Sequence, residues 1–377
     1  MDVDFIVIGA GMAGLSAAAE LSRHARVAVI EREAQPGYHS TGRSAALFSE
    51  FYGNATIRGL TRASRSFLFD PPAGFAEPPL VAARGTLFFA ATDEMDALDA
   101  LAVSLGTDSK PLRLDAAQTL ERVPVFKPGY LGGSLYEDGS VDINVATLLQ
   151  GYAAMCHRQQ ASLHFDSPVE GIEREGAMWR VRSTKLVLRA PVVVNAAGSW
   201  GDEIARLAGV APVGLVPKRR TAVTIDVPGG MSAHRWPAAV HAAETFYFKP
   251  DAGRLLLSPA DETPSEPCDA QPDELDIAIA VDKFETASGS LVRRLHGHWA
   301  GLRSFVADKT PVVGFDDQAS GFFWLVGQGG YGIQTAPAMA RAASALAQGR
   351  RLPAELLDQG VSADALGPRR VDLHRPR

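Results

Sequence analysis

Three glycines near the start of the chain have a spacing that could do chemistry. Gly9, Gly11 and Gly14 form a G-x-G-x-x-G motif between an apolar run, 4–9, and an Ala-rich segment. In such a turn the first glycine permits a tight bend, the second lets backbone approach a pyrophosphate, and the third allows close helix–strand packing. The anion then binds at the helix N-terminus. The motif alone is weak, because unrelated βα units also contain Gly-rich turns.

A carboxylate after the next apolar run strengthens the dinucleotide interpretation. Glu31 ends the predicted strand 27–31 about 20 residues after the motif, where an acidic side chain accepts hydrogen bonds from ribose hydroxyls. Arg32 follows it, and a second Gly-rich strand–loop–helix segment spans 321–349. These features favour FAD as the resident cofactor, with NAD as the alternative.

Arg303 and the basic run 218–220 are cations far from the motif whose environments differ. Arg303 lies in a small and apolar stretch, AGLRSF, where an unpaired charge is costly unless it faces a site. The alternative is a structural salt bridge. Arg220 belongs to the run Lys218-Arg219-Arg220, which on charge alone is typical of a solvated patch. In a strand, Lys218 and Arg220 share one face and Arg219 takes the other.

Two kinds of sheet are expected to position these residues. Buried parallel strands are predicted at 4–9, 27–31 and 190–200. Alternating patterns predict antiparallel strands at 163–173, 178–188, 219–227, 244–250 and 254–260, with a hairpin turn at 251–253 and a further strand at 85–92. Helices are expected at 55–70, 94–106, 115–124 and 143–160.

The chain is therefore predicted to be an α/β protein of two discontinuous domains. At 377 residues it exceeds the length, about 250, at which single cores stop growing. A Rossmann-like FAD-binding domain with a parallel sheet is expected from 1–79, 141–215 and 311–365. An α+β substrate-binding domain with a mostly antiparallel sheet is expected from 80–140 and 216–310. Residues 366–377 are expected to be a loose tail.

Composition excludes several other classes of protein. The net charge is −6 and no large basic run is present, so no nucleic-acid partner is expected. Cys156 and Cys268 are far apart and lack His or Cys at ligand spacing, so neither a disulfide framework nor a metal site is predicted. A reducing, cytoplasmic setting fits this usage. No run of about 18 apolar residues predicts a transmembrane segment; peripheral membrane contact stays open.

Six segments carry a family resemblance. They are REAQPGYHSTGRSAA (32–46), VNAAGSW (194–200), PKRR (217–220), FYFKPDAG (246–253), AGLRSFVAD (300–308) and QGGYGIQT (328–335). Over nearly its whole length the chain resembles the D-amino-acid dehydrogenase branch of the D-amino acid oxidase superfamily, the bacterial D-arginine dehydrogenases most of all. The resemblance implies hydride transfer from the substrate Cα to flavin N5, which gives an imino acid that hydrolyses to a 2-oxo acid.

The resemblance also implies a set of site residues. Arg220, Arg303 and Tyr247 would bind the substrate carboxylate, Tyr52 would lie on a mobile loop beside the site, and the Gly330 backbone would meet the substrate amine. The substrate pocket would include Leu47, Phe48, Thr86 and Gln334. The cofactor would contact Gly9, Gly11, Met12, Ala13, Gly14, Glu31, Arg32, His39, Ser40, Thr41, Gly42, Arg43, Ser44, Ala45, Val169, Ala197, Gly198, Trp200, Gly329, Gly330, Tyr331, Gly332, Ile333 and Gln334. His39 by itself is more typical of an ordinary loop histidine.

Two positions depart from the D-arginine dehydrogenase pattern. Thr86 stands where those enzymes place a glutamate for the cationic side chain, and Leu47 replaces a histidine beside the flavin. Losing a charge-assisted bond of about 1.5–3 kcal/mol should weaken arginine binding. The expected pocket of Leu47, Phe48, Phe51, Thr86 and Leu87 is apolar, so we predict a neutral substrate that is bulky or cyclic.

The mode of FAD attachment is predicted from a further difference between this sequence and related oxidases. Some related oxidases tether FAD through a cysteine near residues 306–312, which here read VADKTPV. We therefore predict non-covalent FAD.

Several alternatives stay open. A neutral substrate amine needs no catalytic base, although His39 or a tyrosine could serve as one. A 2-hydroxy-acid dehydrogenase would need a base for the hydroxyl, and Leu47 counts against it. Oxidation of secondary or cyclic amines is a closer alternative to amino-acid oxidation than a hydroxy-acid reaction is. The non-enzymatic alternative is a flavin-binding redox protein or partner-binding protein. The resemblance favours a D-amino acid, but handedness, the electron acceptor (quinone, oxygen or another) and the oligomeric state (monomer or dimer) are undetermined.

Overall fold

A mostly parallel sheet carries the glycine motif. The computed structural model describes residues 1–106, 109 and 111–370. The order of strands in this sheet is β19 (Val312–Phe315), β20 (Phe322–Val326), β13 (Val192–Asn195), β1 (Phe5–Ile8), β2 (Val27–Ile30) and β9 (Ser162–His164). All neighbours are parallel except β19 and β20. The predicted parallel sheet is confirmed, and it brings the carboxyl ends of β1 and β2 side by side.

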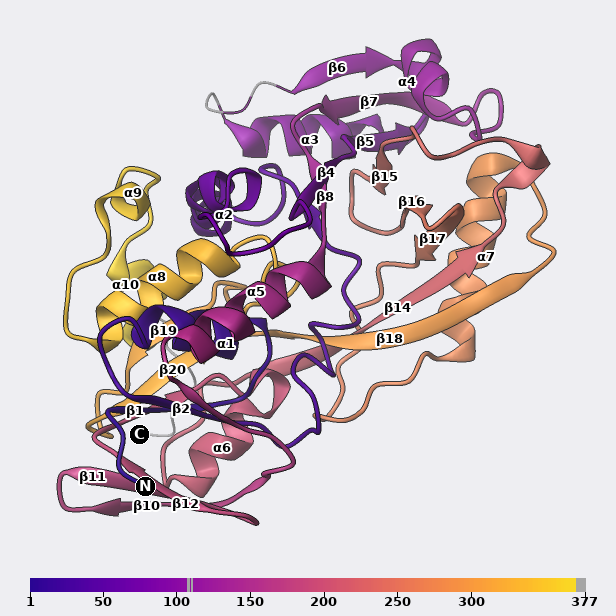
Figure 1. Ribbon diagram of the computed structural model, residues 1–377. Helices are drawn as coiled ribbons and strands as arrows, with labels where there is room; N and C mark the ends of the chain where they lie inside the picture. Colours follow the sequence, from indigo (N-terminus) through magenta and orange to yellow (C-terminus); the bar gives the residue numbers. More distant parts are fainter. Residues whose placement is uncertain (107–108, 110, 371–377) are drawn as a thin grey trace.

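Both faces of this sheet are covered, which explains its uninterrupted apolar strands. Val7 and Val29 share a core with α1 (Met12–Leu21), α5 (Val145–Arg158) and α8 (Ala336–Ala347). Ile6 and Ile30 face the opposite core, which includes the small antiparallel sheet of β10 (Val169–Glu175), β11 (Met178–Ser183) and β12 (Val187–Ala190). Figure 1 shows the three helices on one side of β1 and β2 and the small sheet on the other.

The prediction of one antiparallel strand over 163–173 is wrong. Residues Ser162–His164 pair in parallel with β2 as an edge strand, and β10 begins only at Val169. The predicted strand 178–188 likewise divides into β11 and β12 around a turn at 184–186. Asp, Ser and Pro occupy the first break at 166–168, and Ser, Thr and Lys at 183–185 stand at the second, so turn-forming residues rather than periodicity mark these breaks.

An eight-stranded sheet forms the other half of the molecule. Its order is β18 (Leu295–Phe305), β14 (Val216–Ile225), β17 (Arg254–Ser258), β16 (Tyr247–Asp251), β15 (Ala238–His241), β5 (Thr86–Ala91), β7 (Leu131–Glu137) and β6 (Leu112–Asp115). Its pairs are antiparallel except that of β15 with β5. The mostly antiparallel second sheet is thus confirmed, as is the hairpin at 251–253, where Ala252 and Gly253 both have positive φ, 45° and 79°.

Helices and a small sheet complete the fold. They comprise α2 (Ala55–Phe69), α3 (Met95–Leu105), α4 (Ala116–Arg122), α6 (Gly201–Leu207), α7 (Glu274–Ser288), α9 (Ala354–Leu357), α10 (Ala363–Leu366) and the sheet of β3 (Leu47–Phe48), β8 (Val141–Ile143) and β4 (Val81–Ala83). Of the expected tail, Pro368–Arg370 form a 3-10 turn in which Arg370 pairs with Asp308; 371–377 lie outside the described residues. Among the described helices, none has the length and apolarity needed to cross a membrane.

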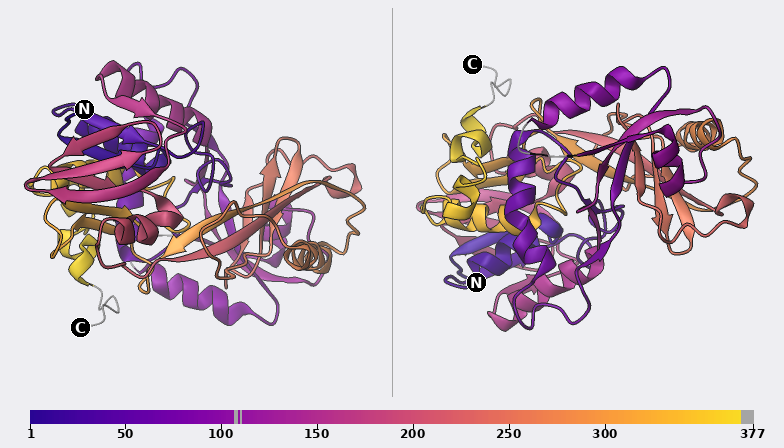
Figure 2. Two further views of the ribbon diagram at one scale, coloured as in Figure 1. Left: turned by 90° about the horizontal axis from the view of Figure 1, so that it is seen from below. Right: turned by 90° about the horizontal axis from the view of Figure 1, so that it is seen from above.

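The long strands β14 and β18 link the two sheets. Figure 2 shows this pair extending from beside the parallel sheet into the eight-stranded sheet. The strands pair from Val216 with Phe305 to Ile225 with Leu295. Arg303 lies near the end of β18 and Arg220 lies in the middle of β14, paired with Gly301; these are the two arginines predicted to bind a carboxylate.

Candidate active site

A cavity of about 500 Å³ lies between the two sheets. It is lined by backbone of the glycine turn, the loop before β3, the middle of β14, the end of β18 and the loop before α8. Most predicted site residues line it, namely Gly9, Gly11, Met12, Ala13, Glu31, Arg32, His39, Ser40, Thr41, Arg43, Ser44, Ala45, Leu47, Tyr52, Thr86, Val169, Ala197, Gly198, Trp200, Arg220, Tyr247, Arg303, Gly329, Gly330, Gly332, Ile333 and Gln334. The structure thus brings together residues from widely separated segments.

The glycine turn between β1 and α1 has no room for side chains. Gly9 has a φ of +107°, and a Cβ there would lie 2.6 Å from the Ala196 carbonyl oxygen. A Cβ on Gly14 would lie 1.9 Å from the Gly9 carbonyl oxygen. Gly14 does not line the cavity but lets α1 pack against β1. The turn therefore presents bare backbone at a helix N-terminus, as a pyrophosphate requires.

Glu31 holds this turn in place while it faces the cavity. One carboxylate oxygen accepts a hydrogen bond from the Ala10 N–H at 2.6 Å, and the other accepts one from the Glu33 N–H at 2.9 Å. Each oxygen keeps a lone pair, so Glu31 can still accept from a ribose hydroxyl. The Thr41 hydroxyl accepts from the Met12 N–H at 3.0 Å and closes the loop over the first turn of α1.

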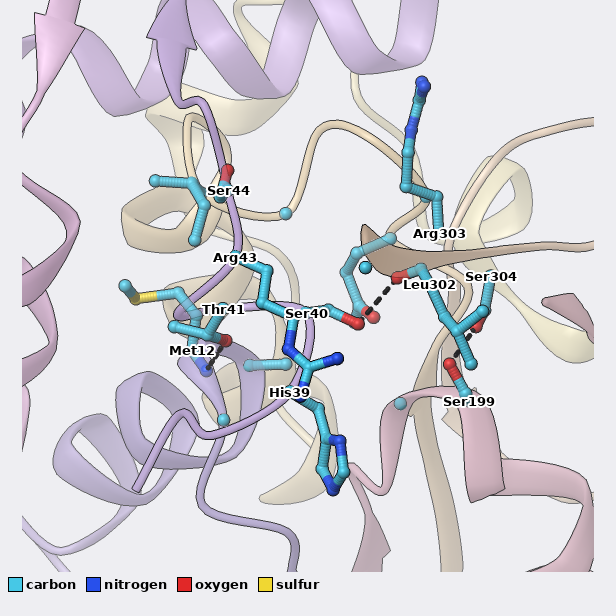
Figure 3. Close-up of a pocket in the computed structure, with 18 of the residues that line it drawn as sticks. Met12, His39, Ser40, Thr41, Arg43, Ser44, Ser199, Leu302, Arg303 and Ser304 are labelled. Atoms are coloured by element: carbon cyan, nitrogen blue, oxygen red, sulfur yellow. Dashed lines mark hydrogen bonds between the residues drawn. The ribbon is translucent and has the colours of Figure 1, made fainter. Parts of the chain in front are cut away.

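The loop that carries His39 to Ala45 is fixed to strand β18. The Ser40 hydroxyl donates to the Leu302 carbonyl oxygen at 2.6 Å, and Arg43 donates to the Ala300 carbonyl oxygen at 3.1 Å and pairs with Asp269. Figure 3 shows these side chains around the cavity. Gly42 does not line it, because this glycine packs on the Gly37 carbonyl oxygen.

Unpaired polar atoms show that the cavity suits a polar ligand. Among the described residues, His39 Nδ1 and Gln328 Nε2 are buried without a hydrogen-bond partner, and both residues line the cavity. Trp200 contacts the His39 ring at 4.6 Å and lies under the Arg32 guanidinium at 5.1 Å. Buried polar groups without partners are rare in folded proteins. Together with the glycine turn and Glu31, they fit a bound FAD.

Arg303 and Tyr52 form the polar end of the cavity. The Arg303 guanidinium donates to the Tyr52 hydroxyl at 2.7 Å. Burial raises the pKa of Tyr52, so its hydroxyl stays protonated. Tyr331 packs edge-on against the Tyr52 ring at 4.7 Å and does not line the cavity, contrary to its predicted cofactor contact. A Cβ on Gly330 would lie 2.4 Å from Arg303 Nη2, so a side chain at this position would displace the guanidinium.

Arg220 and Tyr247 add a second cation and a second hydroxyl. The Arg220 guanidinium lies 6.0 Å from the Tyr247 ring centre, and its Nε donates to the Asp261 carbonyl oxygen at 2.9 Å. Arg219 faces away and pairs with Asp276 at 2.8 Å. The alternation predicted for the basic run therefore holds.

Sequence reasoning missed Glu244, which lines the cavity. Enclosure raises the pKa of its carboxyl, while the Arg303 and Arg220 charges lower it. The segment 244–250 was predicted as one strand, yet the strand starts at Tyr247 and Glu244 has a φ of +54°. A left-handed glutamate in a tight turn leaves no sequence signal of its own.

The remaining wall is apolar but differs in part from the prediction. Leu47 and Thr86 line it, whereas Phe48, Phe51 and Leu87 are buried in the hydrophobic cores and do not. The reason is strand alternation: Phe48 faces away from Leu47, and Leu87 faces away from Thr86. The missed apolar lining residues are Phe88, Val240, Ala222 and Ala260.

Gln334 lines the cavity but its amide is already bound. Its oxygen accepts from the Ser49 N–H at 3.2 Å, and its nitrogen donates to the Ser49 carbonyl oxygen at 3.3 Å and to the Thr61 hydroxyl at 2.8 Å. Gln334 thus holds the loop that leads to Tyr52, and this differs from the predicted direct contact with substrate.

Comparisons with known proteins agree with this geometry. The family model described as "DAO: FAD dependent oxidoreductase" matches residues 4–346. The chain is 24% identical over 355 residues to a glycine oxidase of Pseudomonas putida, covering 90% of this chain and 92% of that one. It is 27% identical over 250 residues to a D-amino acid dehydrogenase of Cereibacter sphaeroides, covering 64% and 55%.

A solved structure is similar in fold. L-alpha-glycerophosphate oxidase from Mycoplasma pneumoniae, with FAD bound, superposes with a TM-score of 0.83 at 17% identity and covers 92% of this chain and 95% of that one. The matched family region spans the glycine turn and both cavity arginines.

Proposed function

Because the chain belongs to the DAO family of FAD-dependent oxidoreductases, we propose that it oxidises a D-amino acid with a neutral, apolar side chain. The glycine turn, Glu31 and the loop 39–45 would hold FAD, which would supply an acceptor for the hydride of the substrate Cα. The product would be an imino acid that hydrolyses to a 2-oxo acid and ammonia. The protein's own part is to bind the carboxylate, orient Cα and exclude water.

The observation that carries this proposal is the pairing of Arg303 with Tyr52 inside the cavity. Among the residues that the structure describes, Arg303 hydrogen-bonds to this hydroxyl rather than to a carboxylate. Its guanidinium can therefore bind a substrate carboxylate through two parallel hydrogen bonds. Arg220 and Tyr247 line the same cavity and supply a second cation and hydroxyl.

The apolar wall supports a neutral side chain. Leu47, Phe88 and Val240 line the cavity, and the adjacent Thr86 hydroxyl lies 2.6 Å from the Ser140 hydroxyl. The charges of Arg303 and Arg220 lower the pKa of Glu244. The Glu244 carboxylate therefore lies near these two arginines and not at the apolar wall. The support for D configuration is the family resemblance and the similarity to a D-amino acid dehydrogenase.

Anaerobic mixing of the yellow protein with a panel of D- and L-amino acids and 2-hydroxy acids tests the proposal. We expect fastest flavin bleaching with apolar D-amino acids. Arginine as the best substrate would contradict the proposed side chain, and faster bleaching by L-enantiomers would contradict the handedness. Faster reaction of hydroxy acids or cyclic amines would favour those alternatives, and no bleaching by any compound would favour a flavin-binding protein without turnover. Reoxidation in air then separates oxidase from dehydrogenase behaviour.

A further inference from the structure

A buried carboxyl group lies directly behind the cavity wall. Glu137 ends β7 and is 7% exposed. Its Oε2 accepts a hydrogen bond from the Ser49 hydroxyl at 2.6 Å, and its Oε1 accepts one from the Glu50 N–H at 2.6 Å. Ser49 lines the cavity. Ser49 therefore lies between the cavity and Glu137.

The position of Ser49 is fixed by bonds that do not depend on its hydroxyl proton. Its N–H and carbonyl oxygen bind the Gln334 amide, and its hydroxyl oxygen accepts from the Phe51 N–H at 3.3 Å. If Glu137 gains a proton, it can donate to the Ser49 oxygen, and the Ser49 proton then turns toward the cavity. The pair can thus hold a proton on either side with the heavy atoms in place.

The charges around Glu137 suit exchange of a proton near neutral pH. Burial raises its pKa to about 7, against the lowering effect of the hydrogen bonds from Ser49 and Glu50. The Glu50 carboxylate raises the pKa further, and Arg65 on α2 lowers it. Arg65 pairs with Glu50 at 3.1 Å. From the neighbouring strand β5, the facing residue is the neutral Thr86.

An amino acid needs such an acceptor because its amine enters as an ammonium at neutral pH. The ammonium must lose a proton before the nitrogen lone pair can assist departure of hydride. A base is most effective when its pKa lies near the working pH. We propose that Glu137, acting through the Ser49 hydroxyl, receives the proton that an ammonium substrate loses to become reactive. This inference rests on the proposed function.

The transfer is balanced without another reactant. The substrate N–H bond breaks and its proton binds Ser49 Oγ, while the Ser49 hydroxyl proton moves to Glu137 Oε2. In total one N–H bond is lost and one O–H bond is formed, and nothing is oxidised or reduced in this step. After the product leaves, the proton returns through Ser49 to water in the cavity.

The E137Q variant tests this transfer because glutamine can keep both contacts but cannot take the proton. We expect kcat/KM to fall about 100-fold at pH 7 and to recover toward alkaline pH, where free amine enters. S49A should show the same alkaline recovery. E50Q is the matched control: it removes a neighbouring carboxylate, so the ionisation in the kcat/KM profile should shift to lower pH but persist. An unchanged ionisation in E137Q would overturn the proposal.

A second measurement does not depend on turnover. In dithionite-reduced protein at pH 8, infrared difference spectra are recorded on addition of D-alanine and of D-leucine. We expect the band of a protonated carboxyl to appear in the wild type and in E50Q but not in E137Q or S49A. This band, combined with no bleaching of the oxidised protein in the anaerobic panel described above, would support proton transfer and refute the proposed oxidation. Bleaching without the band would support the proposed oxidation and refute proton transfer to Glu137. Absence of both signals would overturn both proposals.

Discussion

The Arg303 guanidinium and the Tyr52 hydroxyl meet at 2.7 Å, although the two residues lie 251 positions apart. One comes from strand β18 and the other from the loop after β3. The proposed carboxylate site is therefore assembled without substrate, so little ordering cost would remain at binding. Substitutions that displace either partner should act on binding more than on stability.

Substitution of Gly330 by alanine should displace Arg303. The added Cβ would lie 2.4 Å from Nη2 and 2.7 Å from Nε of that guanidinium. We expect KM for the amino acid to rise at least about tenfold, which corresponds to a weakened charge-assisted bond. Steady-state kinetics would measure it. G297A is a matched control on β18, since its Cβ meets the Thr224 hydroxyl at an ordinary 3.4 Å; equal effects of both variants would refute the steric explanation.

Lysine substitutions at two adjacent arginines should have different effects. R220K removes a planar donor from the cavity, so we expect KM to rise about tenfold with unfolding midpoint little changed. R219K weakens the pair with Asp276 outside the cavity, so we expect a lower thermal midpoint and an unchanged KM. Kinetics and thermal denaturation of both variants check this contrast. A raised KM in R219K alone would show that the strand faces are wrongly assigned.

Introduction of a carboxylate at Thr86 should change side-chain preference. Thr86 lines the cavity beside Phe88 and Val240. T86E places an acceptor where a cationic side chain would lie, so we expect the ratio of kcat/KM for D-arginine over D-leucine to rise more than tenfold. S140A serves as control, because it removes the hydrogen-bond partner of Thr86 without adding charge. An unchanged ratio in T86E would place the substrate side chain elsewhere.

Glu137 should make stability depend on pH with a definite sign. Its pKa is about 7 in the folded protein against 4.5 for the free side chain, so the folded state binds the proton more tightly. The contribution of Glu137 to the free energy of unfolding is therefore greatest below about pH 4.5 and falls as the pH rises toward 7, by about 3 kcal/mol relative to E137Q. Urea unfolding of both proteins across this range measures the difference. A constant difference would mean that Glu137 stays ionised throughout.

FAD should leave the protein without bond cleavage. Among the described residues, Cys156 is buried in the core and Cys268 is exposed, and neither lines the cavity. We expect acid precipitation to release all of the flavin into the supernatant, as absorbance would show. Yellow colour retained by the pellet would contradict non-covalent binding, and digestion followed by mass spectrometry would then locate the attachment.

The sequence predicted what depends on local pattern and missed what depends on distant pairing. The glycine turn, Glu31 and the opposite directions of Arg219 and Arg220 follow from spacing within one element. The side of β3 that faces the cavity cannot be predicted in this way, because a strand of two residues is too short to show a period. For this reason Phe48 was wrongly predicted to line the substrate pocket. Glu137 was missed for a different reason: its role depends on Ser49, 88 positions away, and no local signal connects them.

The pairing of β5 with β15 also affects how the chain is made. One edge of β5 (Thr86–Ala91) pairs with β7, which follows at Leu131–Glu137, but its other edge pairs with Ala238–His241, which is synthesised much later. Strand β1 likewise pairs with β13, far along the chain. Such long-range contacts slow folding, because the connecting chain must be ordered before the contacts are gained. During synthesis, both sheets therefore expose apolar edges until late segments emerge. We expect truncated chains to need chaperones, and the full chain to mature slowly after release from the ribosome.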